Sequence, residues 1–307
     1  MSELALGTWR FGRDSDEADT FAQLDLFRDR GGNFVDAADV YGDGLAEEIV
    51  GRWLASRGGR DELVVATKVW GRTGPGPNAL GLSRKHILSA IDASLRRLQT
   101  DHVDVYYVHR WDYTTPIEET MEALDAVVRA GKARYLGASS MYAWQFATAQ
   151  HVAEKNGWHR FVAMQNHYHL AYREEEREMV PLCLDQGVGV LPYSPLARGL
   201  LTGTRAPGGG GSTTRSGNDP AAQQLYSDAD FGVVDALLEV ARDLGRPPAQ
   251  VALAWLHDRP GVTAPIVGVT QERHLEDALA SVDLELGAEE CARLEAPYLP
   301  HPVAGPE

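Results

Sequence analysis

The sequence contains 307 residues, of which 44% are hydrophobic and 24% are charged. This composition is typical of a globular protein, and the length allows one barrel-sized domain or two smaller domains. The formal net charge of -15 disfavours nucleic acid or an anionic membrane surface as a partner, because like charges repel and the sequence shows no basic patch.

Cys183 and Cys291 are the two cysteines of the chain. No signal-like segment precedes them, so we expect reduced thiols in a cytoplasmic protein and no disulfide. No window approaches the roughly 18 uninterrupted apolar residues of a membrane-spanning helix. The sequence therefore predicts neither export nor membrane insertion.

Eight short runs rich in β-branched and aromatic residues predict strands. They cover residues 4–7, 34–37, 63–68, 103–109, 133–138, 161–165, 188–194 and 264–269. Most are separated by about 25 to 40 residues with helical signals, which is typical of βα units and a parallel sheet. Because no domain-like linker interrupts the pattern, we predict an α/β fold with one (β/α)8 TIM barrel over residues 1–307, rather than two doubly wound domains.

Helix signals between these runs support the βα pattern. Ser83 is in position to cap a helix whose residues Ile87, Ile91, Leu95 and Leu98 share one face. The sequence therefore predicts an amphipathic helix after the third strand.

A second helix is predicted after the fourth strand. Thr115 and Glu118 have the spacing of a capping box, and Pro116 stands at the expected first helical position. Gly131 is expected to end this helix.

Residues 203–230 form the one low-complexity stretch and include the run GGGGS. This run resembles an engineered linker, but the barrel pattern resumes after it, so we predict a mobile glycine-rich loop on the barrel. No Walker motif is present, and a flap over a ligand is the most that this loop suggests.

Four polar residues are predicted to meet at one end of the barrel. Asp36, Lys68 and His109 end the second, third and fourth strands, and Tyr41 follows in the loop after the second. Alone, each has an ordinary structural explanation as a helix cap, surface lysine, core histidine or loop anchor. Together, a lysine paired with Asp36 and placed beside a phenol lowers the pKa of Tyr41, which favours proton donation near neutral pH.

Six ordered segments then resemble one known family. They are FVDAADVYG, VVATKVWG, VDVYYVHRWD, GKARYLGASSMYAWQ, MQNHYHL and YSPLARGLLTG, and the similarity extends from residue 6 to about residue 285. The chain resembles an aldo-keto reductase. The resemblance implies reversible NAD(P)H-dependent reduction of an aldehyde or ketone, in which Tyr41 donates the proton, Lys68 and Asp36 tune it, and His109 orients the carbonyl oxygen.

The resemblance also implies a set of cofactor contacts. Ser139, Ser140 and Gln165 hold the carboxamide, Tyr193 stacks on the nicotinamide, and the remaining expected contacts are Ser194, Leu196, Gly199, Leu201, Gly268, His274 and Asp277. The adenosine end departs from the family pattern, because Thr270, His274, Asp277 and Ala278 stand where many relatives carry cationic or amide residues. NADPH is the favoured cofactor and NADH is the alternative.

Trp9, Trp70 and Trp111 flank the catalytic strand ends and are expected to wall a pocket for a small carbonyl substrate. Arg110 is a candidate cation for an anionic substrate. The histidines of the segment HYH (167–169) alternate as zinc ligands do, but no third ligand is evident, so we expect no metal. The sequence does not distinguish a monomer from a homo-oligomer.

Two rival functions remain open. One is a non-catalytic nicotinamide-nucleotide-binding regulatory subunit, and the other is a Schiff-base aldolase that uses Lys68 as its nucleophile. The four converging polar residues argue against the first, and the cofactor motifs argue against the second.

Overall fold

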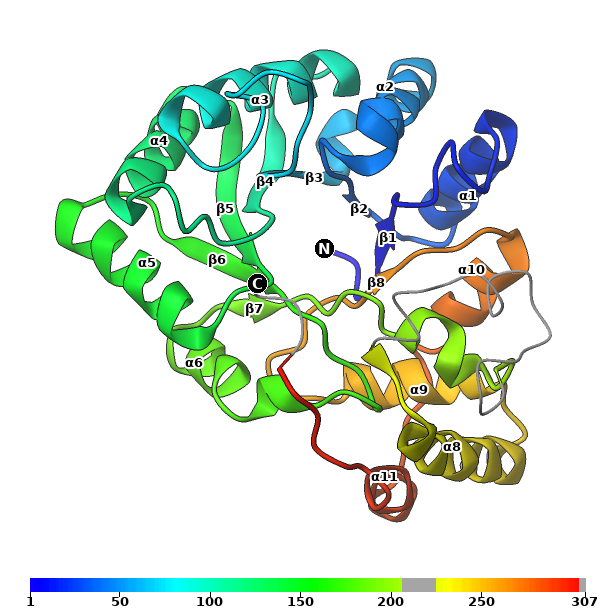
Figure 1. The fold of residues 1–307 in the computed structure, drawn as a ribbon. Coiled ribbons are helices and arrows are strands. Elements are labelled where there is room, and N and C mark those ends of the chain that lie inside the picture. The colour runs from blue at the N-terminus through cyan, green and yellow to red at the C-terminus, as the bar shows by residue number, and fades with distance from the viewer. Residues whose placement is uncertain (206–224, 304–307) are drawn as a thin grey trace.

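The computed structural model describes residues 1–205 and 225–303. Within them, eight parallel strands form one sheet in the order β7-β6-β5-β4-β3-β2-β1-β8 (Figure 1). The strands are β1 (Ala5–Gly7), β2 (Phe34–Asp36), β3 (Val64–Val69), β4 (Val103–Val108), β5 (Ala133–Ser139), β6 (Phe161–Gln165), β7 (Gly189–Val190) and β8 (Ile266–Val267). All eight predicted strands are confirmed.

The two edges of this sheet meet between β7 and β8. The Thr263 N–H donates to the Val190 carbonyl at 2.8 Å, the Ile266 N–H donates to the Pro192 carbonyl at 2.8 Å, and Tyr193 forms a parallel bridge with Ile266. These bonds close the sheet, and the predicted (β/α)8 barrel is confirmed.

Helices cover the outside of the barrel (Figure 1). They are α1 (Glu17–Asp29), α2 (Leu45–Arg57), α3 (Arg84–Leu98), α4 (Ile117–Arg129), α5 (Ala143–Asn156), α6 (Met179–Asp185), α8 (Phe231–Leu244), α9 (Pro248–His257), α10 (Glu272–Leu279) and α11 (Ala288–Glu295). Figure 1 shows α8 and α11 together outside α9. The regular alternation of strand and helix therefore continues to β7, and extra helices follow β7 and β8.

Side chains fill the inside of the barrel. One buried cluster there consists of Ala5, Phe34, Ala66, Val105, Tyr107, Ala163, Leu191, Ala264 and Ile266. Successive strand residues point to opposite faces, so the residue two positions after a member of this cluster also points inward. This alternation directs Asp36, Lys68 and His109 into the C-terminal mouth.

Glycine is required next to one of these inward residues. A Cβ on Gly137 of β5 would lie 2.2 Å from the ring of Tyr107 on β4. Only a residue without a side chain leaves room for this fully buried ring.

The predicted helix after β3 is confirmed. The Ser83 hydroxyl accepts a hydrogen bond from the His86 N–H at 3.3 Å, and α3 begins at Arg84. The expected apolar face packs inward, with Ile87 and Ile91 completely buried.

The predicted capping box at the start of α4 is wrong. The hydroxyl of Thr115 donates to Asp112 Oδ2 at 2.7 Å instead of accepting from the helix, and Pro116 is the N-cap without a side-chain cap. The acid three residues earlier competes for the hydroxyl, and the spacing rule does not consider it. Gly131, with φ of 74°, lies just beyond the C-cap Ala130, so the predicted end of this helix is confirmed.

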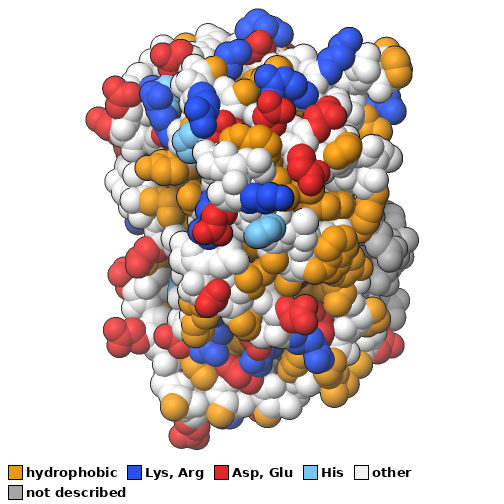
Figure 2. Space-filling view, turned by 90° about the vertical axis from the view of Figure 1, so that its left-hand side faces the viewer, with side chains coloured by type: hydrophobic (Ala, Val, Ile, Leu, Met, Phe, Trp, Pro, Cys, Tyr) orange, Lys and Arg blue, Asp and Glu red, His pale blue; other side chains and the backbone are white. Residues whose placement is uncertain are grey.

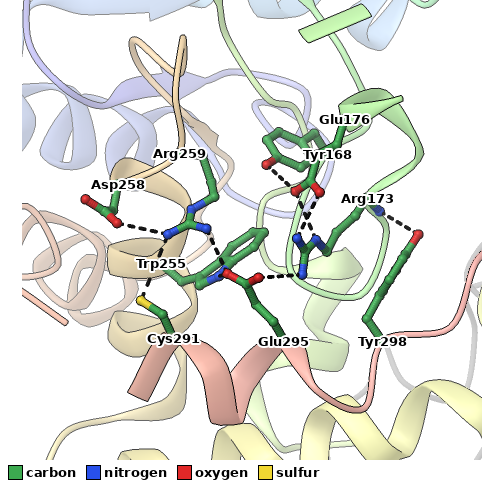
Figure 3. Close-up of polar contacts among 9 residues, drawn as sticks. All are labelled: Tyr168, Arg173, Glu176, Trp255, Asp258, Arg259, Cys291, Glu295 and Tyr298. Carbon is green, nitrogen blue, oxygen red and sulfur yellow. Dashed lines mark hydrogen bonds and ion pairs between the residues drawn. The ribbon is translucent and has the colours of Figure 1, made fainter. Parts of the chain in front are cut away.

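A polar network, which we call the α11 network, fastens α11 to the barrel. Glu295 accepts hydrogen bonds from Trp255 Nε1 at 2.9 Å and Arg259 Nη1 at 2.7 Å, and it forms an ion pair with Arg173 at 3.1 Å (Figure 3). Tyr298 follows α11 and accepts from the Arg173 N–H at 3.0 Å. The C-terminal helix is thus tied to both α9 and the segment after β6.

Basic and acidic side chains are interspersed over the face shown in Figure 2, without an extended area of one sign. In the part of the chain that the structure describes, no helix combines the length and apolarity needed to cross a membrane. Most of the predicted glycine-rich loop at 203–230 lies outside the described residues.

Candidate active site

Lys68 is the centre of the polar cluster at the barrel mouth. Its ammonium donates to Asp36 Oδ2 at 2.6 Å, to the Ala37 carbonyl at 2.9 Å and to Tyr41 Oη at 3.1 Å. An ammonium has three N–H donors, and all three are used here. Lys68 is therefore held in one orientation, and its charge lies beside the Tyr41 oxygen.

The Asp36 carboxylate connects this cluster to β6. Its second oxygen, Oδ1, accepts from Gln165 Nε2 at 2.6 Å. The side chains of Lys68 and Asp36 are only 1% and 3% exposed, so each charge depends on the other for compensation. This bond brings a predicted cofactor residue into direct contact with a predicted catalytic residue.

The predicted net decrease in the pKa of Tyr41 is wrong. Burial raises the pKa of Tyr41 above its ordinary value, the Lys68 charge offsets part of this effect, and the Asp36 charge adds to the increase. The phenol therefore stays protonated at neutral pH. Lys68 donates to Tyr41 Oη, so the Tyr41 O–H remains free of this contact and can donate to another oxygen.

His109 is neutral, whereas Lys68 carries a positive charge. Burial, followed by the nearby charges of Lys68 and Arg110, holds the pKa of His109 well below its ordinary value, so the imidazole is neutral. Burial lowers the pKa of Lys68, but Asp36 and Tyr41 outweigh it and the net pKa is raised. The rings of Tyr41 and His109 meet edge to face, with centroids 5.9 Å apart. A neutral N–H donor and a phenolic O–H donor thus lie side by side.

The predicted carboxamide residues lie together beside this cluster. Ser139 of β5 is the register partner of Gln165 of β6, and the Ser140 hydroxyl donates to Tyr193 Oη at 3.2 Å. Ser140 has a φ of 49°, which turns the chain at the strand end. Hydroxyl, amide and aromatic groups are therefore combined in a way that fits a flat aromatic amide such as nicotinamide.

The loop after Tyr193 has an unusual backbone. Ser194, Ala197, Arg198 and Gly199 all have positive φ, at 52°, 50°, 54° and 95°. Such turns are typical of loops that present backbone N–H groups to an anion, and a Cβ on Gly199 would contact nothing closer than Arg205 at 3.9 Å. The Ala197 and Gly199 N–H groups donate within the loop, to the Ser194 and Leu196 carbonyls at 2.8 and 2.9 Å, so the room at Gly199 is the feature that suits a phosphate group.

Two leucines of this loop lie in different surroundings. Leu196 is half-buried, whereas Leu201 is completely buried in a hydrophobic cluster. The Leu201 N–H donates to the Leu196 carbonyl at 3.3 Å. Leu201 thus fastens the loop to the core.

The predicted adenosine-end residues surround the end of β8 and α10. Gly268 and His274 are exposed, and Asp277 accepts from Gln250 Nε2 at 3.1 Å. Arg273 donates to Gln271 Oε1 at 2.7 Å on the exposed surface. These contacts do not select between NADPH and NADH.

Aromatic side chains line the predicted substrate side. Trp9, Trp70 and Trp111 are half-buried, and Trp70 has a φ of 153°, a rare value for a residue with a side chain. Trp111 contacts Trp144 with ring centroids 5.9 Å apart. Trp144 is 59% exposed and was missed from the sequence, although its position just after β5 places it at the mouth.

Arginines surround one of these tryptophans. The guanidinium groups of Arg10, Arg13 and Arg198 lie 5.3, 5.4 and 5.5 Å from the centre of the Trp9 ring. Arg110 is half-buried next to His109. Several arginines therefore gather around Trp9, and Arg10 among them is paired with Asp14 at 2.9 Å.

His167 and His169 contact each other and Tyr226. Their Nε2 atoms are 3.0 Å apart, and His169 Nδ1 accepts from the Ala171 N–H at 3.2 Å. That bond places the His169 proton on Nε2, where it opposes metal binding. The His167 ring also stacks on Tyr193 at 5.6 Å, so the pair supports the predicted nicotinamide platform.

A parallel barrel with a buried acid–base cluster at its C-terminal mouth defines a (β/α)8-barrel enzyme. A sequence model of the aldo/keto reductase family matches residues 3–298. The chain therefore belongs to the aldo/keto reductase family, and it is an oxidoreductase.

Relatives of known name are similar over nearly the whole chain. The versiconal hemiacetal acetate reductase of Aspergillus parasiticus is 40% identical, covering 99% of this chain and 95% of the relative. The aldo-keto reductase AMT2 of Alternaria alternata is 41% identical, covering 94% and 84%. The uncharacterised oxidoreductase YrpG of Bacillus subtilis is 38% identical, covering 94% and 90%.

Proposed function

We propose that this protein reduces an aldehyde or ketone to an alcohol, with NADPH as the favoured cofactor and NADH as the alternative. The observation that carries this proposal is the hydrogen bond of 3.1 Å from Lys68 to Tyr41 Oη, together with the bond from Lys68 to Asp36. A reduced nicotinamide supplies the hydride when bound. Family membership and the reductase names of the relatives support this reaction class.

Tyr41 is the proton donor in this proposal. Its raised pKa keeps the phenol protonated at neutral pH, and its O–H is not engaged with Lys68. As the proton leaves, the adjacent ammonium stabilises the phenolate that forms. Neutral His109 donates a second hydrogen bond to the same carbonyl oxygen and orients it.

This chain's own residues at the mouth would hold the cofactor. Ser139, Ser140 and Gln165 would bind the carboxamide, Tyr193 would pack against the ring, and the loop from Ser194 would hold the pyrophosphate. Leu196 and Gly199 lie within this loop. Gly268, His274 and Asp277 would contact the adenosine end, and Trp9, Trp70, Arg110 and Trp111 would enclose the substrate.

The Schiff-base alternative is disfavoured by the state of Lys68. A lysine nucleophile must lose its proton, yet the raised pKa and the three hydrogen bonds favour the ammonium form. Reductive trapping of Lys68 with a carbonyl compound and borohydride would contradict this assignment.

A carbonyl panel assayed with NADPH and NADH in parallel tests the proposal. Tyr41→Phe should lower kcat by about 10²- to 10⁴-fold while cofactor binding, measured by fluorescence quenching, is retained. Tyr135→Phe is the matched control, because Tyr135 is 58% exposed and loses the same hydroxyl. Near-wild-type turnover by Tyr41→Phe would refute the proton donor, and cofactor binding without turnover of any carbonyl would favour the regulatory-subunit alternative.

A further inference from the structure

Asp39 is a buried acid that the proposed reaction does not use. It lies between Asp36 and Tyr41 in the loop after β2 and is 2% exposed. Its N–H donates to the Lys68 carbonyl at 3.3 Å, so its backbone is attached to the strand that carries the lysine. Acids are common in turns, so its place in the sequence does not set it apart.

The Asp39 carboxyl has unusual surroundings. Among the described residues, no side chain donates a hydrogen bond to either of its oxygens, and only the Val40 backbone N–H helps to favour the charged form by hydrogen bonding. A buried carboxylate without partners is much more costly than a neutral carboxyl group. Burial, and then the nearby Glu47 charge, raises the pKa of Asp39 to about 8.

Charged and titratable groups face Asp39 from several elements. Glu47 of α2 disfavours its ionisation, whereas Arg97 of α3 and Lys68 of β3 favour it. Tyr106 of β4 and Tyr41 of its own loop also interact with its charge.

Its acidic neighbour has a different arrangement. Glu47 is completely buried, but it accepts from Thr67 Oγ1 at 2.5 Å and from Arg97 Nε at 2.7 Å. Glu47 is therefore a fully paired structural acid that braces the residue next to Lys68. Asp39 has no such side-chain pairing, so when it ionises its negative charge acts on Lys68 and Tyr41 and is offset only in part by the charges of Arg97 and Lys68.

We propose that Asp39 is a positioning residue that acts through Lys68 and Tyr41 and makes proton donation by Tyr41 depend on the charge of this loop. This role rests on the proposed function. When Asp39 ionises, its negative charge raises the pKa of Tyr41, because it disfavours a second negative charge nearby. The phenol then remains a proton donor to higher pH than it does beside a neutral residue.

The pH dependence of kcat/KM for carbonyl reduction tests this role, because it reports ionisations of the free enzyme. In Asp39→Asn, the falling alkaline limb should move to lower pH by about half a unit. Asp43→Asn is the matched control: Asp43 is exposed in the same loop, and this variant should keep the wild-type profile. Asp39→Ser, which introduces a smaller neutral side chain, should give the same shift. This variant replaces Asp39→Asn in the test if the Asn variant does not fold.

The outcomes separate this role from the proposed function. A wild-type protein that reduces no carbonyl refutes the proposed function. An active wild type with an unchanged alkaline limb in Asp39→Asn refutes only the role of Asp39. A uniform loss of turnover at every pH, with the limb at its wild-type position, also refutes it, because a merely structural residue behaves in this way.

Discussion

The barrel mouth and the α11 network both combine cations, carboxylates and aromatic rings, but they treat charge in opposite ways. In the α11 network, burial opposes ionisation of Glu295, yet the bond from Trp255 and the charges of Arg173 and Arg259 lower its pKa overall. At the mouth, burial raises the pKa of Tyr41 and lowers that of His109. One network stabilises the charged form of its acid, whereas the other keeps key groups neutral and ready to exchange a proton.

Exposure accounts for part of this difference. The side chains of Arg173, Arg259 and Glu295 are 15%, 17% and 27% exposed, whereas those of Lys68 and Asp36 are 1% and 3% exposed. Water screens the first set and penalises the second. A dense polar network thus indicates chemistry only when its pKa shifts favour the neutral, proton-carrying or proton-accepting form of buried groups, as they do for Tyr41 and His109.

Removing the cation from the mouth should have the largest effect. Lys68→Met leaves Asp36 as a buried charge without its partner, so we expect a loss of about 3–5 kcal/mol in the free energy of unfolding, measured in urea. The double variant Asp36→Asn/Lys68→Met should recover much of that loss but remain without turnover. Equal stability of the single variant and the wild type would show that Asp36 does not depend on Lys68 for charge compensation.

The pH dependence of stability should have opposite signs in the two regions. The pKa of Asp39 is raised from 3.8 to about 8 in the folded protein, so its contribution to stability is lost as pH rises through this window. The free energy of unfolding of Asp39→Asn, relative to that of the wild type, should therefore increase by about 1.4 kcal/mol per pH unit within this window. Unfolding titrations of both proteins measure this slope, and parallel curves would show that Asp39 ionises normally.

Glu295 should show the reverse behaviour with a smaller magnitude. Glu295→Gln should cost about 1–2 kcal/mol of stability near neutral pH, without changing kcat. Its folded pKa lies below 4.5, so this advantage of the wild type should disappear as pH falls below that value. Asp243→Asn, which removes an exposed ion pair to Arg293 of α11, is the control and should leave the melting temperature unchanged.

Strand positions and the convergence of the four mouth residues could be predicted because both depend on short-range periodicity. Runs such as FVDA and VDVYYVH mark the strands, and alternation along them directs Asp36, Lys68 and His109 inward. The barrel then brings distant segments together at one end. The bond from Gln165 to Asp36 follows from the same closure, although it joins residues far apart in the sequence.

The remaining features depend on competition that the sequence does not reveal. Thr115 binds Asp112 instead of capping α4, and Asp39 is buried although its turn sequence is typical of the surface. The direction of the pKa shift of Tyr41 depends on whether desolvation or the Lys68 charge is larger, which requires coordinates. Trp144 was missed because a tryptophan at a helix start gives no signal of its exposure.

The strands that support the mouth residues differ in length. Lys68 lies on the six-residue strand β3 and His109 directly follows the six-residue strand β4, whereas Tyr193 and its loop follow β7, which has two residues. Segments with little backbone pairing open more readily than well-paired ones. The loop proposed to hold the phosphates of the nucleotide is therefore supported by a shorter strand than Lys68 and His109 are.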